Sequence, residues 1–456
     1  MFNLIFQFAF LRKMSILFDI KPFNFFKKIM NKLFITDLHP EYRDFIHLYC
    51  SWGKEEFFQR LEEGLFIHNE QDKEISLYLG WDMFSYISYG VWQNLFLNWL
   101  AHLFLIRKFV DEKGLVVKSI KYIYGNHEFY LNTNDINFET SSYLFAHGLN
   151  IENFNELQIE FLGFLEYCGF ILRRNNIIYP KGLRVLNSPE KFESMRVVRD
   201  LYEGGLSLIF PEANIQKINN SIQIVGDGVL LMGNTLFAPY LWKFNKNITT
   251  KELEPLNMLN DKNYLFQNYK NWALGRLSHL EIFENWFDSV GYYAPDLIPL
   301  IEDFEYIRKE LVEKKEPSIR EFYYITQFFF LYGFLTLMSS FNVIWRDKNI
   351  KNPTKHIEIM THFPFNVFSK EFENEYQIKH HIKEKDLEKV LHYQKDALNS
   401  YFNIDESYFR LLLSRLNKEN FPNLETVTFF CGHTHIPHTS SWESEWISFK
   451  VINRSS

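Results

Sequence analysis

The chain has 456 residues and a mass of 55.0 kDa, enough for two or three average domains. Its hydrophobic share of 46% and charged share of 23% are those of a globular protein and exclude wholesale disorder. A net charge of −7 gives no overall attraction for nucleic acid or an anionic membrane. Three widely separated cysteines, Cys50, Cys168 and Cys431, exclude a disulfide framework and suit a reducing cytoplasm, so we expect a cytoplasmic protein.

The first 29 residues read as an extension outside the core. Met1–Phe10 is apolar, but Arg12 and Lys13 follow this run, whereas a secretory signal has its positive residues first. A strand-like run begins directly after Met30. We therefore expect 1–29 to be a separate N-terminal extension.

Five short apolar runs, each closed by Gly, Pro or Asp or by a polar loop, recur along the chain and predict strands. They are Lys32–Thr36, Ile75–Leu79, Val116–Tyr124, His356–Thr361 and Val427–Cys431. Helical patterns, for example Glu41–Tyr49 and Val91–Val110, lie between several of them. Strands alternating with helices predict an α/β fold whose sites collect beyond the carboxyl ends of the strands.

The loops that follow these runs carry one kind of chemistry. Together they hold Asp37, His39, Asp82, Asn126, His127, His362, His433 and His435. Carboxylate, amide and imidazole groups are ligands of divalent ions such as Mn²⁺, Fe²⁺ or Zn²⁺. Asp37 and His39, at i and i+2 on extended backbone, point to the same side. The number of candidate ligands exceeds the needs of one ion and suits two ions that share a carboxylate.

These motifs resemble the ordered motifs of the calcineurin-like metallophosphoesterases, which are D-x-H, G-D, G-N-H-D/E, H and G-H-x-H. The matching segments are Asp37-Leu-His39, Gly80 with Asp82, Gly125-Asn-His-Glu128, His362 and Gly432-His-Thr-His435. The resemblance implies a two-sheet α/β sandwich flanked by helices. It also implies two divalent metal ions, Mn²⁺ foremost, with Fe²⁺, Zn²⁺ or Co²⁺ as alternatives.

The resemblance implies a role for each site residue. Asp37, His39 and His435 would hold one ion, Asn126, His362 and His433 the other, and Asp82 would bridge them. His127, oriented by Glu128, would act as the general acid. The implied enzyme is a phosphatase or phosphodiesterase that hydrolyses phosphate mono- or diesters by attack of a metal-bridging hydroxide.

One motif departs from the family pattern, because Trp81 separates Gly80 from Asp82. The adjacent pair Gly226-Asp227 comes out of order, and we interpret it as a hairpin turn between Ser221–Val225 and Val229–Met232. The altered motif leaves an alternative function open: a catalytically weakened metal-binding or regulatory protein on the same fold.

Two charge-free stretches raise the question of a membrane. Phe322–Trp345 has no charged residue over 24 positions, and Val91–Ile106 is shorter. A crossing at Phe322–Trp345 would put His362 on the opposite side from Asp37, and one site could not form. We therefore expect no transmembrane span, while peripheral membrane contact stays compatible with the sequence.

The motifs also predict the domain organisation. Residues 30–240 would form the first part of the core and 356–456 the second. The segment 241–355 between them reads as a largely helical insertion, with apolar spacing in Leu277–Phe287 and Phe304–Glu313. Because it is inserted near the expected metal end, we expect it to form a cap that influences the choice of phosphoester substrate.

Overall fold

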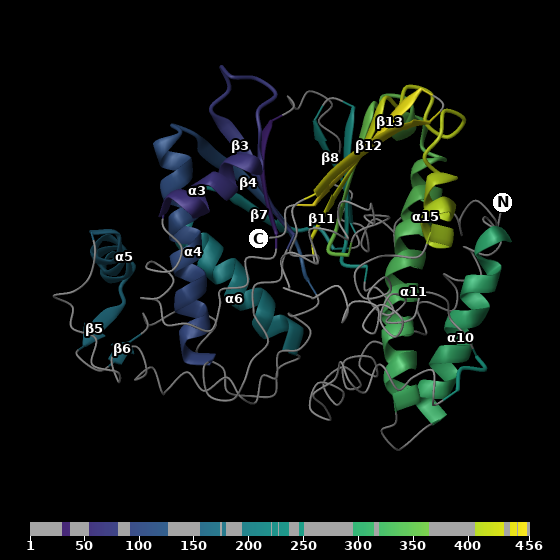
Figure 1. Ribbon diagram of the computed structural model, residues 1–456, viewed down its shortest axis with the longest axis horizontal. Helices are drawn as coiled ribbons and strands as arrows, with labels where there is room; N and C mark the ends of the chain where they lie inside the picture. The colour runs from purple at the N-terminus through teal and green to yellow at the C-terminus, as the bar shows by residue number, and fades with distance from the viewer. Residues whose placement is uncertain are drawn as a thin grey trace, which may run out of the picture. The chain divides into compact units, whose positions relative to one another are not determined.

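The computed structural model describes residues 30–36, 54–80, 92–125, 156–173, 176–178, 194–219, 221–226, 228–236, 246–249, 295–313, 319–363, 406–432, 438–444 and 446–453. The described residues fall into two compact units, one within Met30–Lys217 and one within Ile218–Ser455. Each unit is built on its own mixed β-sheet with helices, so the chain is an α/β protein, as the sequence predicts (Figure 1).

The first unit contains a five-stranded sheet in the order β2-β1-β3-β4-β7. Its strands are β1 (Asn31–Thr36), β2 (Leu65–Phe66), β3 (Glu74–Gly80), β4 (Val116–Ile123) and β7 (Asn214–Lys217). All neighbouring pairs are parallel except β1 with β2. The strands β1 and β3 are almost continuously buried, as expected where helices cover a parallel sheet. The three strands predicted here are confirmed to within one residue at each end.

Four helices of this unit are described: α3 (Lys54–Glu63), α4 (Trp92–Glu112), α5 (Glu156–Tyr167) and α6 (Ser194–Ile209). Helix α4 confirms the helix predicted over Val91–Val110, whereas the predicted helix Glu41–Tyr49 lies outside the described residues. Helices α4 and α6 pack together, with the ring of Trp99 edge-on to that of Tyr202 at 5.7 Å (Figure 1). A small hairpin joins β5 (Ile171–Arg173) and β6 (Asn176–Ile178).

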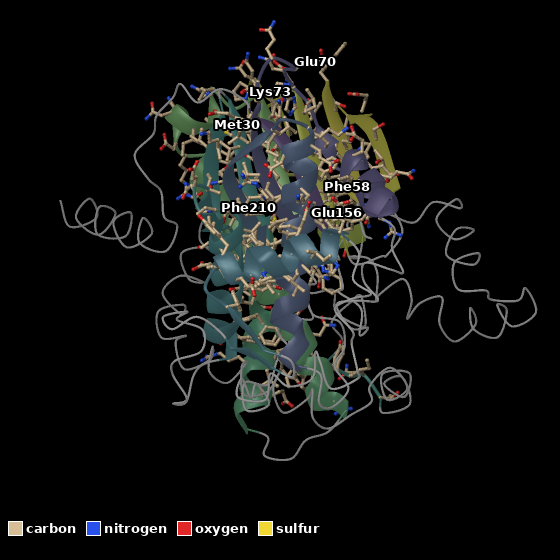
Figure 2. All side chains as sticks on the ribbon, turned by 90° about the vertical axis from the view of Figure 1, so that its left-hand side faces the viewer. Met30, Phe58, Glu70, Lys73, Glu156 and Phe210 are labelled. Carbon is tan, nitrogen blue, oxygen red and sulfur yellow. The ribbon has the colours of Figure 1, made fainter. Side chains whose placement is uncertain are left out.

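The amino edge of this sheet is held by one buried asparagine. Asn31 Nδ2 donates to the carbonyl oxygens of Asn69 (2.9 Å) and Asp72 (2.7 Å), and its Oδ1 accepts from the amides of His68 and Asn69. Figure 2 labels Met30, Glu70 and Lys73 close together at this end of the unit. The carboxyl ends of β1, β3 and β4 therefore lie at the opposite edge of the sheet.

The second unit contains a six-stranded sheet in the order β12-β13-β11-β10-β9-β8. Its strands are β8 (Ser221–Gly226), β9 (Val229–Asn234), β10 (His356–Thr361), β11 (Thr426–Cys431), β12 (His438–Ser444) and β13 (Ile447–Asn453). The four inner strands are parallel and both outer strands are antiparallel to their neighbours. The antiparallel pairing of β8 with β9 confirms the hairpin predicted between Ser221–Val225 and Val229–Met232.

Helices cover one face of this sheet. Helix α15 (Glu406–Leu413) places Phe409 edge-on to Phe429 of β11 at 5.7 Å. The long helix α11 (Ile319–Ile344) contacts the end of β9, where Asn234 Nδ2 donates to the carbonyl of Gly333 at 2.9 Å. The sheet face with Phe429 and Asn234 is therefore the helix-covered one.

The described part of the predicted insertion 241–355 is helical apart from 246–249, 345–347 and 352–355. It contains η6 (Pro295–Leu297), α10 (Ile298–Glu313), α11 and α12 (Lys348–Lys351). Helices α10 and α11 pack side by side through Phe304 and Phe328, whose rings stack at 4.9 Å (Figure 1). Phe304–Glu313 is confirmed as helix, whereas Leu277–Phe287 lies outside the described residues.

Candidate metal centre

The strands that lead to the predicted ligands are described, but most of the ligands are not. Eight of the nine predicted site residues lie outside the described residues: Asp37, His39, Asp82, Asn126, His127, Glu128, His433 and His435. His362 is described. Across the described ranges, no three His, Cys, Asp or Glu side chains form a group able to hold a metal ion. The described parts of the candidate centre are therefore the strand ends and His362.

In the first unit, three predicted motifs follow adjacent parallel strands. Thr36 is paired with Gly80, and Gly80 with Ile123, so β1, β3 and β4 end level with one another. Thr36 Oγ1 donates to the carbonyl oxygen of Gly80, which ties the two strand ends together. The ends of β1 and β3 are also closely packed, because a Cβ added to Gly80 would lie 3.3 Å from both Phe34 Cε2 and Thr36 Oγ1. Neighbouring strands are about 4.8 Å apart, so the three motifs leave the sheet from closely spaced points.

An aromatic cluster anchors β4 just before its predicted motif. The ring of Tyr122 lies 5.8 Å from that of Tyr124 and 6.1 Å from that of Tyr202. The Tyr122 hydroxyl donates to Glu203 Oε1 at 2.8 Å. Burial, together with the nearby Tyr124 and Glu203, raises the pKa of Tyr122 far above its ordinary value, so it remains a neutral donor. These contacts hold the chain in place up to Tyr124, two residues before the predicted ligand Asn126.

In the second unit, His362 follows the last residue of β10 and is fully buried. Its ring lies edge-on to that of Phe363 at 5.0 Å. Its backbone amide donates to the carbonyl of Thr235 at 3.2 Å, and its carbonyl accepts from the amide of Gly432 at 2.9 Å. Gly432 directly precedes His433 in the sequence. The segment with the predicted ligands His433 and His435 therefore starts beside the backbone of the predicted ligand His362.

Three polar residues at this edge were not predicted from the sequence: Asn234, Thr235 and Asn453 are all buried. Asn234 and Asn453 are the last residues of β9 and β13, and each follows buried residues at the end of its strand. That position, a polar residue that ends a buried strand, is the signal that could have identified them.

Helix α11 contains the charge-free stretch that raised the membrane question. Tyr323–Asn342 is the one described segment that is long and apolar enough to cross a membrane, and 94% of its 18-residue apolar window is buried inside the structure. A buried core helix has the same composition, so the finding is compatible with the expected absence of a transmembrane span. Its aromatic residues pack on other helices, as Phe330 does on Tyr408 of α15 at 4.6 Å.

Comparisons with protein-family models, with curated proteins and with solved structures find no match to this chain.

Proposed function

We propose that this chain is a metal-dependent phosphoesterase of the metallophosphoesterase type, a two-sheet sandwich with a dinuclear centre. One observation carries the proposal. The five strands expected to precede the motifs all exist with nearly the predicted bounds, and each runs parallel to its inner neighbours. Each motif therefore leaves its sheet at the carboxyl edge, where α/β proteins bind ligands.

The residues fit a pair of divalent cations. His362 is a fully buried imidazole at a strand exit, a position suited to a metal ligand. The full donor set of carboxylates, one amide and imidazoles matches Mn²⁺ foremost, and also Fe²⁺, Zn²⁺ or Co²⁺. When bound, two such ions would make water a nucleophile at neutral pH and offset the negative charge of a phosphoryl group.

The chain's own residues have separate roles in this proposal. Asp37, His39 and His435 would hold one ion, and Asn126, His362 and His433 the other, with Asp82 shared. His127 would donate a proton to the leaving alkoxide, and Glu128 would hold its imidazole in the required orientation. The substrate class is a phosphate mono- or diester.

Metal binding tests the proposal directly. Calorimetric titration of metal-free protein with Mn²⁺ is expected to give two bound ions, and His362→Ala is expected to lose one of them. His356→Ala is the matched control, because His356 begins the same strand and lies about 20 Å from His362, which follows its other end. His356→Ala is expected to keep both ions. Wild-type protein that binds no divalent ion would refute the proposal.

Activity tests the chemistry. Purified protein with Mn²⁺ is assayed on an alkyl phosphate monoester and on the corresponding diester, beside His127→Ala, because an alkoxide needs a proton in order to leave. Loss of a general acid lowers the rate by about 10²–10⁴-fold. A loss of activity with both esters would support His127 as the general acid, even if the loss is smaller with the diester. Full activity of His127→Ala would exclude this role.

A second function is favoured by one observation, the insertion of Trp81 between Gly80 and Asp82. A protein with a weakened bridging ligand would bind metal and act as a regulatory or binding module. Stoichiometric metal without turnover on a broad panel of phosphoesters would select this function over the enzyme.

A further inference from the structure

A row of hydrogen bonds continues the second unit's sheet beyond the ends of its strands. β9, β10 and β11 end at Asn234, Thr361 and Cys431. One residue further on, the His362 amide donates to the Thr235 carbonyl (3.2 Å), and the Gly432 amide donates to the His362 carbonyl (2.9 Å). His362 is therefore held by its backbone as a strand residue is, although it lies in a loop.

The row is completed by a side chain. β13, the next strand, ends at Asn453, which is paired with Cys431. Asn453 Nδ2 donates to the carbonyl of Gly432 at 3.1 Å, in the place of the next backbone bond. Asn453 is fully buried. A buried amide donor without a hydrogen-bond acceptor costs free energy, so breaking this contact would be unfavourable.

The other end of the row is fixed as well. Asn234 Nδ2 donates to Gly333 of helix α11, and Asn234 Oδ1 accepts from the amide of Leu236 at 2.9 Å. Leu236 has a φ of 44°, a left-handed conformation that is unfavourable for a residue other than glycine. Asn219 Nδ2 also donates to Thr235 Oγ1. The Thr235 carbonyl that accepts from His362 therefore belongs to a tightly constrained segment.

We propose that Asn453 is a positioning residue for His362, acting through Gly432. This inference rests on the proposed metal-dependent function, because it concerns a predicted ligand of that centre. Asn453 holds the Gly432 carbonyl, the Gly432 amide holds the His362 carbonyl, and the imidazole follows its backbone. Groups that orient metal ligands in this way typically change metal affinity by about 10–100-fold when they are replaced.

The test is Asn453→Asp, which keeps the shape but loses the amide donor. Two measurements are made on folded protein: Mn²⁺ affinity by calorimetry, and amide hydrogen exchange of the peptide that contains Gly432. We expect a 10–100-fold weaker affinity and faster exchange at Gly432 in the metal-free protein. Asn453→Leu, which removes both polar groups, is the second variant. It should show the same weaker Mn²⁺ affinity and the same faster exchange at Gly432.

Two controls separate positioning from a general loss of stability. Asn31→Asp alters an equally buried asparagine that also donates to backbone carbonyls, but at the amino edge of the other sheet. Asn423→Asp alters an exposed asparagine of the same unit whose Nδ2 donates to the Asn352 carbonyl at 2.6 Å. Both are expected to lower the unfolding temperature or leave it unchanged, while Mn²⁺ affinity stays as in the wild type.

The outcomes distinguish this inference from the proposed function. Wild-type protein that binds no Mn²⁺ overturns both. Wild-type protein that binds two ions, with Asn453→Asp binding them equally well, overturns the positioning role and leaves the function standing. An equal loss of Mn²⁺ affinity in Asn31→Asp also overturns the positioning role, because the loss would then come from lower stability of the protein.

Discussion

Replacing Gly333 with alanine tests whether helix α11 is a core helix of the second unit. Gly333 lies within α11, and its carbonyl accepts from Asn234 of β9. A Cβ at this position would lie 2.8 Å from Asn234 Oδ1 and 3.5 Å from Leu236 Cδ2. The Asn234 amide cannot move away freely, because its Oδ1 also accepts from the Leu236 amide. The methyl group must therefore push the helix away from the strand or break these bonds.

The magnitude follows from three opposing contributions. Alanine is favoured over glycine inside a helix by about 1 kcal/mol. Overpacking of a filled site costs about 1–3 kcal/mol, and the weakened hydrogen bond costs about 1 kcal/mol. We expect Gly333→Ala to lower the free energy of unfolding by about 2 kcal/mol. For a unit of this size, that loss lowers the unfolding temperature by about 4–8 °C.

The assay is calorimetric and urea-induced unfolding of the full chain, with Gly163→Ala as the matched control. Gly163 also lies inside a helix, α5, but it is exposed, and no atom of the described residues would come within 4 Å of a Cβ there. The same substitution should therefore stabilise the protein at this position, by about 0.5–1 kcal/mol. The two variants are expected to change stability in opposite directions.

A result in which both variants are neutral or stabilising would refute the reasoning. It would mean that Gly333 does not face β9 and that α11 is packed elsewhere. That outcome would be expected of a helix whose Gly333 faces lipid, and it would reopen the question of a membrane span.

Three further predictions concern single contacts. Gly205→Ala should lower stability by about 1–3 kcal/mol in urea unfolding, because its Cβ would lie 2.6 Å from Nε1 of the buried Trp99; no change would contradict the packing of α4 on α6. Trp446→Gly should raise the unfolding temperature, because Trp446 is 91% exposed and held at a φ of 67°; a drop would show that its indole makes a stabilising contact. Tyr122 has a raised pKa in the folded state, so unfolding should become easier as the pH rises above about 10, where the unfolded tyrosine ionises. Tyr122→Phe should make this decline shallower in a pH series of unfolding curves, and an unchanged slope would contradict the burial of that hydroxyl.

Much of the strand framework could be predicted from the sequence. Short runs rich in β-branched and aromatic residues, closed by Gly, Pro or Asp, have few alternatives to a buried strand. For this reason the predicted bounds of β1, β3, β4, β10 and β11 agree with the observed ones to within one residue. The candidate ligands could be proposed in the same way, because their chemistry stands at the ends of these runs.

Other elements could not be predicted because their signal is weak or non-local. Helix α6 contains the dipeptide Gly204-Gly205, which has low helix propensity, and tertiary packing of Gly205 against Trp99 supports it. Helix α11 is apolar on all sides, so composition could not separate a core helix from a membrane helix. The contact with Asn234 and the burial of the segment argue for the core.

The sequence by itself determined seven of the described strands, β1, β3, β4, β8, β9, β10 and β11, and their order along the chain, because these depend on local apolar runs and the residues that close them. Only the tertiary structure decided which strands are neighbours, since β9 pairs with β10 across more than a hundred residues of chain. The same holds for Asn453 and Gly432, whose hydrogen bond joins residues 21 positions apart. Such bonds depend on strand register, and register is set by the packing of the whole sheet rather than by any local pattern.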